Sequence, residues 1–458
     1  MNIQEWRGKR VLVVGMARSG IAATKLLADA GAMPIINDSK SADQLGGALD
    51  ELRGLPCQWR LGEPALELLD GCDAVVISPG VPIGSPFIRE AKARKLPVVG
   101  ELELGFLFVP GRYVAITGTN GKTTTASLMA EICKNAGMLT WLAGNIGYPL
   151  TALAGKTRPE DVVVAEVSSF QCESFDTFHP QVAAVLNLTE DHIDRHGTME
   201  AYAALKRRVF ERQDAQNVAV LNWDDARCRE MAQGILPRVA WFSRREPVAY
   251  GTYLSDQNEI VVAMNGVSKA ICSAAEVQLP GPHNLENALA AAAMSAALGV
   301  PLPVIRHTLR SFAGVEHRME TVRELGGVRY INDSKGTNVD ATLRAIESMT
   351  APTVLILGGS DKHVDFTPLA QSVCDHPMIR RVVLIGETAP KIALALDSVQ
   401  YKGYVHEGSD MEAALRRCRE QAEVGWNVLL SPACASFDMF QDFEHRGRVF
   451  KQLVSGLQ

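Results

Sequence analysis

The sequence lacks the basic excess that a nucleic-acid-binding protein needs. Its 458 residues include 46 Lys and Arg against 52 Asp and Glu, so the formal net charge is −6. Neutralising a phosphate backbone requires a surplus of cationic side chains, so we expect no nucleic-acid partner. Any acidic small molecule must instead be bound by local groups of positive residues.

No apolar stretch is long enough to cross a bilayer. The longest, at residues 288–300, is rich in alanine. It is shorter than the ~20 residues that a spanning helix needs, so we expect a buried helix there. The first apolar run, 11–14, is soon followed by Arg18 and Lys25, which is not the pattern of a signal peptide. The sequence therefore predicts a cytoplasmic protein without membrane insertion.

The nine cysteines include no C-x-x-C pair, and their odd number prevents all of them from joining in disulfides. Reduced thiols are typical of cytosolic proteins. Low-complexity segments are absent as well, and 47% hydrophobic with 21% charged residues is the balance of a folded protein. A chain of this length is expected to form two to four domains.

Apolar runs alternate with helix-like stretches along the chain, which predicts an α/β fold with mainly parallel sheets. The pattern divides into three domains. Residues 1–102 form a Rossmann-like domain, 103–315 a central P-loop ATPase-type domain, and 316–458 a second Rossmann-like domain. The predicted strands of the first domain are 11–14, 34–37, 74–77 and 97–99.

The first domain carries a variant of the dinucleotide-binding fingerprint. Gly15 and Gly20 frame a G-x-A-x-x-G turn between strand and helix, and Asp38 closes the second strand. Such a turn can place a phosphate over a helix N-terminus and an acid near a ribose, but a tight strand-to-helix turn explains the same residues. Ser78 and Gly80 follow the third strand at the same edge, which favours a nucleotide or nucleotide-sugar site.

The strongest motif is a phosphate-binding loop in the central domain. An apolar strand at 113–117 leads into Gly118-Thr119-Asn120-Gly121-Lys122-Thr123-Thr124 and then a helix. Glycines let backbone N–H groups close on phosphates, Lys122 supplies positive charge, and the Thr123 hydroxyl can bind Mg²⁺. Ile116 stands where the usual pattern has its first glycine, so the loop is a variant.

Two more strands are expected to bring polar groups to the same edge. The strand at 162–165 ends in Glu166, where a nucleotide-bound Mg²⁺ would be held. The strand at 183–188 ends in a cluster that includes His192 and His196. On a helix this spacing would also suit zinc, but no cysteine or third histidine stands nearby, and nucleotide chemistry favours Mg²⁺. We expect His196 to be a surface or hydrogen-bonded histidine.

The third domain contains three strands that each lead into a loop of small residues. The strands are 328–332, 354–357 and 428–430. Two of the loops carry a lysine, Lys335 and Lys362, which suits capture of phosphate or carboxylate. A solvated surface lysine explains each loop alone, but together the loops predict a second anion site.

Several segments resemble the Mur ligase family. They are VAITGTNGKTT, AEVSSFQ, LTEDHIDRHG and GPHNLENALAA, while NDSKGTN, LGGSDK and SPACASFDMF resemble its D-glutamate-adding branch. The D-N-P-R motif of the branch that adds a diamino acid is absent. The resemblance covers nearly the whole chain and implies ATP-dependent ligation of D-glutamate to UDP-N-acetylmuramoyl-L-alanine through an acyl phosphate, in cytoplasmic synthesis of peptidoglycan precursors. We expect a monomer.

The resemblance also implies roles for individual residues. Catalytic roles would fall to Lys122, His192, Lys206, Lys335 and Lys362. ATP contacts would come from Gly118, Thr119, Asn120, Gly121, Lys122, Thr123, Thr124, Asn287, Arg318 and Asp333. Ligands for two Mg²⁺ ions would be Thr123, Glu166, His192 and Lys206, the last as a carbamate. Without the family, Lys206 would be assigned to a helix surface.

Two sets of substrate contacts follow in the same way. The UDP-substrate would be bound by Arg18, Ser19, Asp38, Ser78, Gly80, Asn145, Ser168 and Gln171. D-Glutamate would be bound by Lys335, Thr337, Lys362, Ser436 and Phe443. Ser360 stands where some members carry an acid, with Asp361 one place later.

Two other classes of protein fit part of the pattern. A nicotinamide dehydrogenase would use the first domain but leave Lys122 and Thr123 unexplained. A P-loop regulator or motor would explain ATP binding but not the paired lysines of the third domain.

Overall fold

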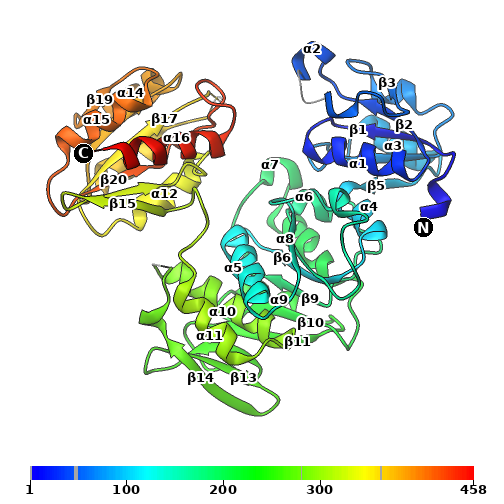
Figure 1. Cartoon of the computed structure of the whole chain (residues 1–458), viewed down its shortest axis with the longest axis horizontal. Helices are drawn as coiled ribbons and strands as arrows, with labels where there is room; N and C mark the ends of the chain where they lie inside the picture. The colour runs from blue at the N-terminus through cyan, green and yellow to red at the C-terminus, as the bar shows by residue number, and fades with distance from the viewer. Residues whose placement is uncertain (1–2, 46–49, 280, 362–363, 458) are drawn as a thin grey trace. The chain divides into compact units, whose positions relative to one another are not determined.

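The computed structural model describes residues 3–45, 50–279, 281–361 and 364–457. The chain forms two compact units, Met1–Phe312 and Ala313–Gln458. The first unit contains two sheets and the second contains one (Figure 1). Within the described ranges, no helix has the length and apolar character needed to cross a membrane.

The first sheet is parallel throughout. In spatial order its strands are β3 (Gln58–Trp59), β2 (Met33–Asn37), β1 (Arg10–Val14), β4 (Ala74–Ile77) and β5 (Val98–Gly100). Helices α1 (Arg18–Asp29) and α4 (Glu101–Phe108) pack on one face, and α3 (Pro86–Ala93) packs on the other. Since β1 lies between β2 and β4, the chain order reverses there, and open α/β sheets bind ligands at such a point.

The second sheet has nine strands. In spatial order they are β14 (Val267–Ser273), β13 (Glu259–Met264), β12 (Gly251–Leu254), β11 (Arg238–Ser243), β10 (Val218–Asn222), β9 (Val182–Val185), β6 (Arg112–Thr117), β8 (Val162–Glu166) and β7 (Thr140–Gly144). The run from β12 to β7 is parallel, and β13 and β14 add an antiparallel edge. Strand β6 lies between β8 and β9, so it marks the reversal of this sheet.

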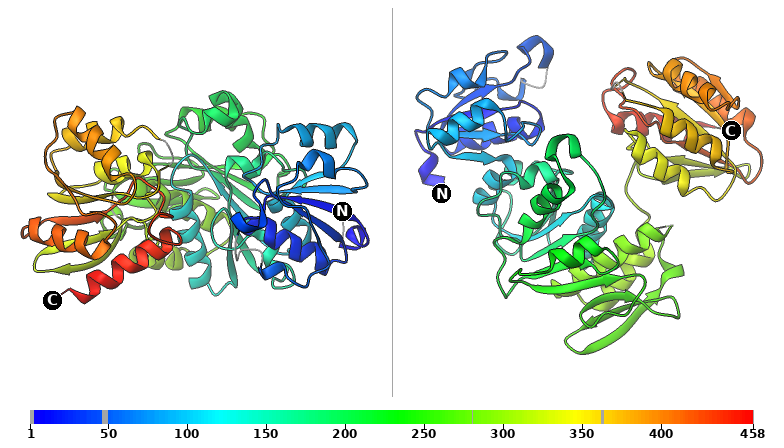
Figure 2. Two further views of the ribbon diagram at one scale, coloured as in Figure 1. Left: turned by 90° about the horizontal axis from the view of Figure 1, so that it is seen from above. Right: turned by 180° about the vertical axis from the view of Figure 1, so that it is seen from behind.

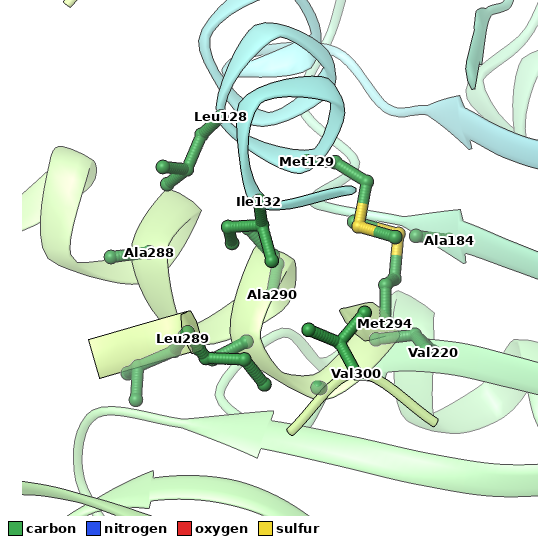
Figure 3. Packing of buried hydrophobic residues seen from close by; sticks show 14 of the residues in the cluster. Leu128, Met129, Ile132, Ala184, Val220, Ala288, Leu289, Ala290, Met294 and Val300 are labelled. Atoms are coloured by element: carbon green, nitrogen blue, oxygen red, sulfur yellow. The ribbon is translucent and has the colours of Figure 1, made fainter. Parts of the chain in front are cut away.

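The alanine-rich segment is a buried helix, as the sequence predicts. Helix α10 (Pro282–Ala297) packs against α5 (Lys122–Asn135) on one face of the second sheet. Figure 3 shows Met129 and Ile132 of α5 among Ala290 and Met294 of α10, all four fully buried. Small alanine side chains let the two helices approach closely, which fixes the start of α10 beside the start of α5.

The remaining helices of this unit cover the second sheet from both sides. Helix α11 (Leu302–Ser311) joins α5 and α10. The opposite face carries η4 (Leu150–Leu153), α6 (Ser169–Cys172), α8 (Met199–Arg207), η5 (Arg208–Phe210) and α9 (Ala226–Met231). The one-turn helix α7 (Ile193–His196) precedes α8.

The second unit is a single twisted sheet between two helix layers (Figure 2). In spatial order its strands are β15 (Glu320–Leu325), β16 (Val328–Asn332), β20 (Asn427–Leu430), β17 (Thr353–Gly358), β18 (Ile379–Ile385) and β19 (Tyr404–His406), and only β15 is antiparallel. One face carries α12 (Val339–Glu347), α13 (Thr367–Asp375) and α14 (Ala389–Ser398). The other carries α15 (Met411–Gln421) and α16 (Phe443–Gly456).

The α/β class and the mainly parallel sheets are confirmed, and several details differ. The third predicted strand of the central domain stops at Val185 rather than 188. Beyond it the chain bonds to the phosphate-loop region, with Leu186 N–H donating to Thr117 (3.0 Å). Strand β3, only two residues long, was not predicted.

All nine cysteines are free; seven are buried, Cys57 is half-buried and Cys374 is exposed.

Candidate active site

The predicted phosphate loop joins β6 to α5. Gly118 (φ +141°) and Gly121 (φ +83°) adopt backbone conformations that favour glycine, and Gly121 precedes the first residue of α5. The Lys122 ammonium donates to the carbonyls of Gly118 (2.9 Å) and Thr119 (2.7 Å). A positive charge thus lies over a helix N-terminus, which is an arrangement suited to a phosphate group.

Asn287 of α10 supports this loop from behind. Its Oδ1 atom accepts a hydrogen bond from the Thr125 hydroxyl (3.2 Å), and its side chain is buried. The amide group also lies directly against Gly121. The structure therefore brings the predicted ATP-contact residue Asn287 to the loop, through the packing of α10 on α5.

Glu166 ends β8, the neighbour of β6. Its Oε1 atom accepts from the Asn145 amide (2.8 Å), whereas Oε2 is buried and has no hydrogen-bond donor among the described residues. Burying a carboxylate oxygen without a partner is costly unless a cation or water meets it. This unpartnered oxygen fits a divalent cation at the end of the strand.

Lys206 is buried, which corrects its assignment from the residues alone to a helix surface. Its side chain is 1% exposed on α8, and its Nζ donates to the Gly118 carbonyl (2.9 Å) and the Thr117 hydroxyl (3.3 Å). Burial, with Lys122 nearby, lowers the pKa of the Lys206 ammonium to about 7. The Lys206 amine therefore loses its proton far more easily than a surface lysine.

The two histidines of the third strand end do not share a helix face. His192 adopts a left-handed conformation (φ +53°) before α7, and its half-exposed ring lies beside the Phe170 ring (4.8 Å between centroids). His196 is buried and bonds to the Ser169 hydroxyl (3.0 Å), so it is a hydrogen-bonded rather than a surface histidine. In the described part of the chain, no three or more His, Cys, Asp or Glu residues are grouped to hold a metal.

Some of the residues that are predicted to contact the UDP-substrate form hydrogen bonds within the protein. The Asp38 carboxylate accepts from the backbone N–H of Met16 (2.7 Å), and the Ser78 hydroxyl donates to the Gly15 carbonyl (2.7 Å). Both contacts hold the Gly15–Gly20 turn in shape. Ser19 lies half-buried in the first turn of α1.

Other members of that set lie on the second sheet or face it. Ser168 and Gln171 form a reciprocal cap at the start of α6, with Gln171 Oε1 accepting from Ser168 N–H (2.9 Å). The exposed Arg18 donates to the Gly147 carbonyl (2.6 Å), two residues after Asn145. The structure thus places Arg18 and Asn145 near each other, although their sheets differ.

In the second unit, Asp333 is buried at the end of β16. Its carboxylate accepts from the Ser431 hydroxyl (2.6 Å) and the Met319 N–H (3.2 Å). Burial raises the pKa of the Asp333 carboxyl to about 6, while Ser431 and the half-buried Arg318 oppose the increase. Arg318 and Asp333, both predicted to contact ATP, are therefore close to each other.

The predicted D-glutamate residues follow three adjacent strands, β16, β20 and β17. The Lys335 ammonium lies 5.7 Å from the centre of the Phe443 ring, and Thr337 N–H donates to the Lys335 carbonyl (2.8 Å). Ser436 is buried in the loop after β20. Lys362 lies outside the described residues, and Asp361 pairs with Lys391.

Three families of known domains match the chain, each on a separate stretch. The Mur ligase MurD-like N-terminal domain matches residues 9–100, the Mur ligase middle domain 116–295, and the Mur ligase glutamate ligase domain 317–434. The UDP-N-acetylmuramoylalanine--D-glutamate ligase of Alkaliphilus oremlandii is 45% identical over 460 residues and 100% of both chains. That of Pelotomaculum thermopropionicum is 45% identical over 456 residues, covering 100% of this chain and 99% of its own. The chain belongs to the Mur ligase family.

Solved structures of other Mur ligases share the fold of this one. The UDP-N-acetylmuramate-alanine ligase of Thermotoga maritima aligns with a TM-score of 0.59 at 17% identity, over 98% of this chain and 99% of its own. The MurF ligase of Thermotoga maritima in complex with ADP aligns with a TM-score of 0.57 at 16% identity, over 99% and 97%. At these identities the likeness concerns the fold alone.

The sequence analysis did not predict a role for two arginines of this Mur ligase. Arg446 of α16 is fully buried and donates to the carbonyls of Ser334 (2.8 Å), Cys434 (3.1 Å) and Ala435 (3.3 Å), so it joins the loops after β16 and β20. Arg195 of α7 similarly bonds to distant carbonyls. Backbone acceptors leave no mark in a sequence, so no signal could have identified either residue.

Proposed function

We propose that this Mur ligase joins D-glutamate to UDP-N-acetylmuramoyl-L-alanine at the expense of ATP, in cytoplasmic synthesis of peptidoglycan precursors. The 45% identity to full-length relatives of that name supports the proposal. The observation that carries it is the convergence of Lys122, Glu166 and Lys206 around the ends of β6 and β8. We assign the UDP-substrate to residues 1–102, ATP to 103–315 and D-glutamate to 316–458.

The chemistry explains why ATP is required. A carboxylate is a poor acyl donor because its leaving group would be oxide. Transfer of the γ-phosphoryl group to the alanyl carboxylate releases ADP and gives an acyl phosphate. The amine of D-glutamate, once deprotonated, attacks the acyl carbon; the amide bond forms and inorganic phosphate leaves. The protein has to position these groups and neutralise their charge.

The loop Gly118–Thr124 supplies the phosphate cradle in this proposal. Its backbone N–H groups and the α5 N-terminus face the phosphates, and the Lys122 ammonium exchanges its bonds to the loop carbonyls for phosphate oxygens. Asn287 keeps the loop in shape from behind. Arg318 and Asp333 are further proposed ATP contacts.

Glu166, Thr123 and His192 are the proposed Mg²⁺ ligands, together with a modified Lys206. The unpartnered Oε2 of Glu166 supports this choice, and Asn145 orients the carboxylate through the other oxygen. When bound, Mg²⁺ neutralises charge on the phosphates. The half-exposed ring of His192 is accessible to a metal ion.

Lys206 is proposed to carry a carbamate. The ammonium first loses a proton; the neutral amine then attacks the carbon of CO₂ and loses a second proton to solvent, so the side chain changes from a cation to a monoanion. The lowered pKa of about 7 supports this step, because a large fraction of the amine is unprotonated at neutral pH. The carbamate then offers oxygen ligands beside the phosphate loop.

The substrate ends are assigned to two further sets of residues. Arg18, Ser19, Asp38, Ser78, Gly80, Asn145, Ser168 and Gln171 are proposed to line the UDP-substrate site. Lys335, Thr337, Lys362, Ser436 and Phe443 are proposed to hold the two carboxylates of D-glutamate while its amine stays free to react.

An ADP-release assay tests the function directly. ADP should appear only when UDP-N-acetylmuramoyl-L-alanine and D-glutamate are both present. Equal turnover with L-glutamate, or full turnover without the acceptor, would refute the assignment. The absence of any change in NAD(P)H absorbance would separate this ligase from a dehydrogenase.

A further inference from the structure

Arg195 connects the two sheets of the first unit at one point. Its guanidinium comes from α7, three residues after His192, and donates to the carbonyls of Pro79 (3.4 Å), Gly80 (3.3 Å) and Val81 (3.2 Å). These carbonyls belong to the loop that follows β4 of the first sheet. Arg195 therefore reaches from the strand end that carries His192 to the loop of the predicted nucleotide-sugar site.

The Arg195 side chain is also held by α6 and the residue that follows it, Glu173. Its Nε and Nη2 atoms donate to the two oxygens of Glu173 (3.1 and 2.6 Å), and the guanidinium lies 4.3 Å from the centre of the Phe170 ring. The side chains of Arg195 and Glu173 are only 15% and 7% exposed. A bidentate pair with little solvent, stacked on an aromatic ring, fixes a guanidinium far better than a surface ion pair.

The connection continues on both sides. The Phe170 ring that supports Arg195 also lies beside His192, and the His192 carbonyl accepts from the Arg195 N–H (3.1 Å). On the other side, Ser78 precedes the loop at 79–81 and bonds to the Gly15 carbonyl (2.7 Å). Arg195 is thus the centre of a series of contacts that runs from the His192 turn to the Gly15 turn.

We propose that Arg195 is a positioning residue that couples binding of the uridine diphosphate to phosphoryl transfer at the alanyl carboxylate. This inference rests on the proposed function. The nucleotide does not react, so its binding energy helps the reaction only if the domain that holds it is fixed to the reacting groups. Without Arg195 the nucleotide still binds, but it no longer places the carboxylate beside the phosphate loop.

Two acceptors distinguish this role from a purely structural one. The full substrate and N-acetylmuramoyl-L-alanine, which lacks the uridine diphosphate, present the same carboxylate. For the unmodified enzyme, the ratio of their kcat/KM values measures how much the nucleotide contributes to the reaction. Arg195→Ala should lower this ratio at least tenfold, with less than a threefold change in kcat/KM for the short acceptor and in the Kd for UDP.

Two further variants complete the experiment. Arg195→Lys keeps the charge but loses the bidentate contact, so its ratio of kcat/KM values should lie between those of the unmodified enzyme and Arg195→Ala. If Arg195→Ala does not fold, Arg195→Lys decides the question. The matched control is Arg212→Ala, which removes an exposed arginine paired with Asp176 (3.1 Å) and should leave the ratio unchanged.

The outcomes are separable. An unchanged ratio in a folded Arg195 variant overturns the inference. Equal losses with both acceptors also overturn it, because Arg195 would then act only on the His192 turn. Failure of the unmodified enzyme to use the full substrate would instead refute the proposed function.

Discussion

A Cβ atom placed on Gly121 would stand 2.2 Å from the Oδ1 atom of Asn287. The phosphate loop and the start of α10 therefore meet without room for even a methyl group. We expect Gly121→Ala to lower kcat/KM for ATP at least ~100-fold, because the loop must move away from the phosphates it cradles. Steady-state titration of ATP checks this.

Gly137 provides the matched control for Gly121. It follows the same helix and has a similar positive φ (+77° against +83°), but nothing lies within 4 Å of its added Cβ. Gly137→Ala should cost about 1–2 kcal/mol of stability through backbone strain and leave ATP turnover intact. Equal losses of activity in both variants would show that strain, and not contact with Asn287, governs the loop.

Removing the Lys122 ammonium should lower kcat by ~100-fold or more. The interaction of this ammonium with the phosphoryl group should strengthen in the transition state, when the γ-phosphoryl group moves to the carboxylate. The measurement is ADP release by Lys122→Ala at saturating substrates. Lys134→Ala, an exposed lysine in the last turn of the same helix, should behave like the unmodified enzyme. A Lys122 variant with normal kcat and only a raised KM for ATP would contradict a role in the transition state.

Replacing Lys206 tests whether it acts as an anion. Lys206→Ala should be nearly inactive and partly restored by small carboxylic acids that fill the vacated space. Lys206→Arg should also fail, because a guanidinium has no lone pair to offer a cation. Activity assays with and without added carboxylate provide the measurement, and full activity in Lys206→Arg would disprove the carbamate.

The pH dependence of the same residue is a separate test. The pKa of Lys206 is about 7. Below that pH the amine is mainly protonated and cannot react with CO₂, and above it the amine is mainly neutral. Turnover should therefore fall as the pH is lowered from about 8 to about 6, and a raised CO₂ concentration should make this decrease smaller. Lys206→Ala, followed in the same assay, should not respond to CO₂. Identical curves with and without CO₂ would count against the modification.

Lys362 tests the amino-acid site. Lys362→Ala should raise the apparent KM for D-glutamate strongly and the KM for ATP much less, since one charge-assisted contact contributes ~1.5–3 kcal/mol. Lys362→Arg should be a poor replacement, because a wide planar group does not fit the place of a compact ammonium. Titrating each substrate separately decides the matter: equal losses would move Lys362 to the phosphate site.

Local patterns were sufficient for four of the five strands of the first sheet. The apolar runs that became β1, β2, β4 and β5 lie within one or two residues of their predicted positions, because buried parallel strands are continuously apolar. The phosphate loop was equally visible, since glycines with positive φ have few substitutes. These features depend on neighbours in the sequence.

Features that depend on distant contacts were not visible. Helix α8 shows which of its side chains share a face, but not that the chain at Thr117 and Gly118 covers Lys206. The hydrogen bond from the Met16 N–H to Asp38 depends in the same way on how β2 ends beside β1. Spacing cannot reveal either relationship.

The distribution of cysteines has a practical consequence. Cys374 is the exposed thiol, whereas burial raises the pKa of the half-buried Cys57 thiol and slows its reaction with electrophiles. Cys374 stands in the last turn of α13. This helix runs back from the carboxyl ends of the strands, so Cys374 lies at the edge of the sheet opposite the loops of the proposed D-glutamate site. A maleimide dye would therefore attach mainly at one place on the natural chain, providing a fluorescent label or a surface tether without mutagenesis.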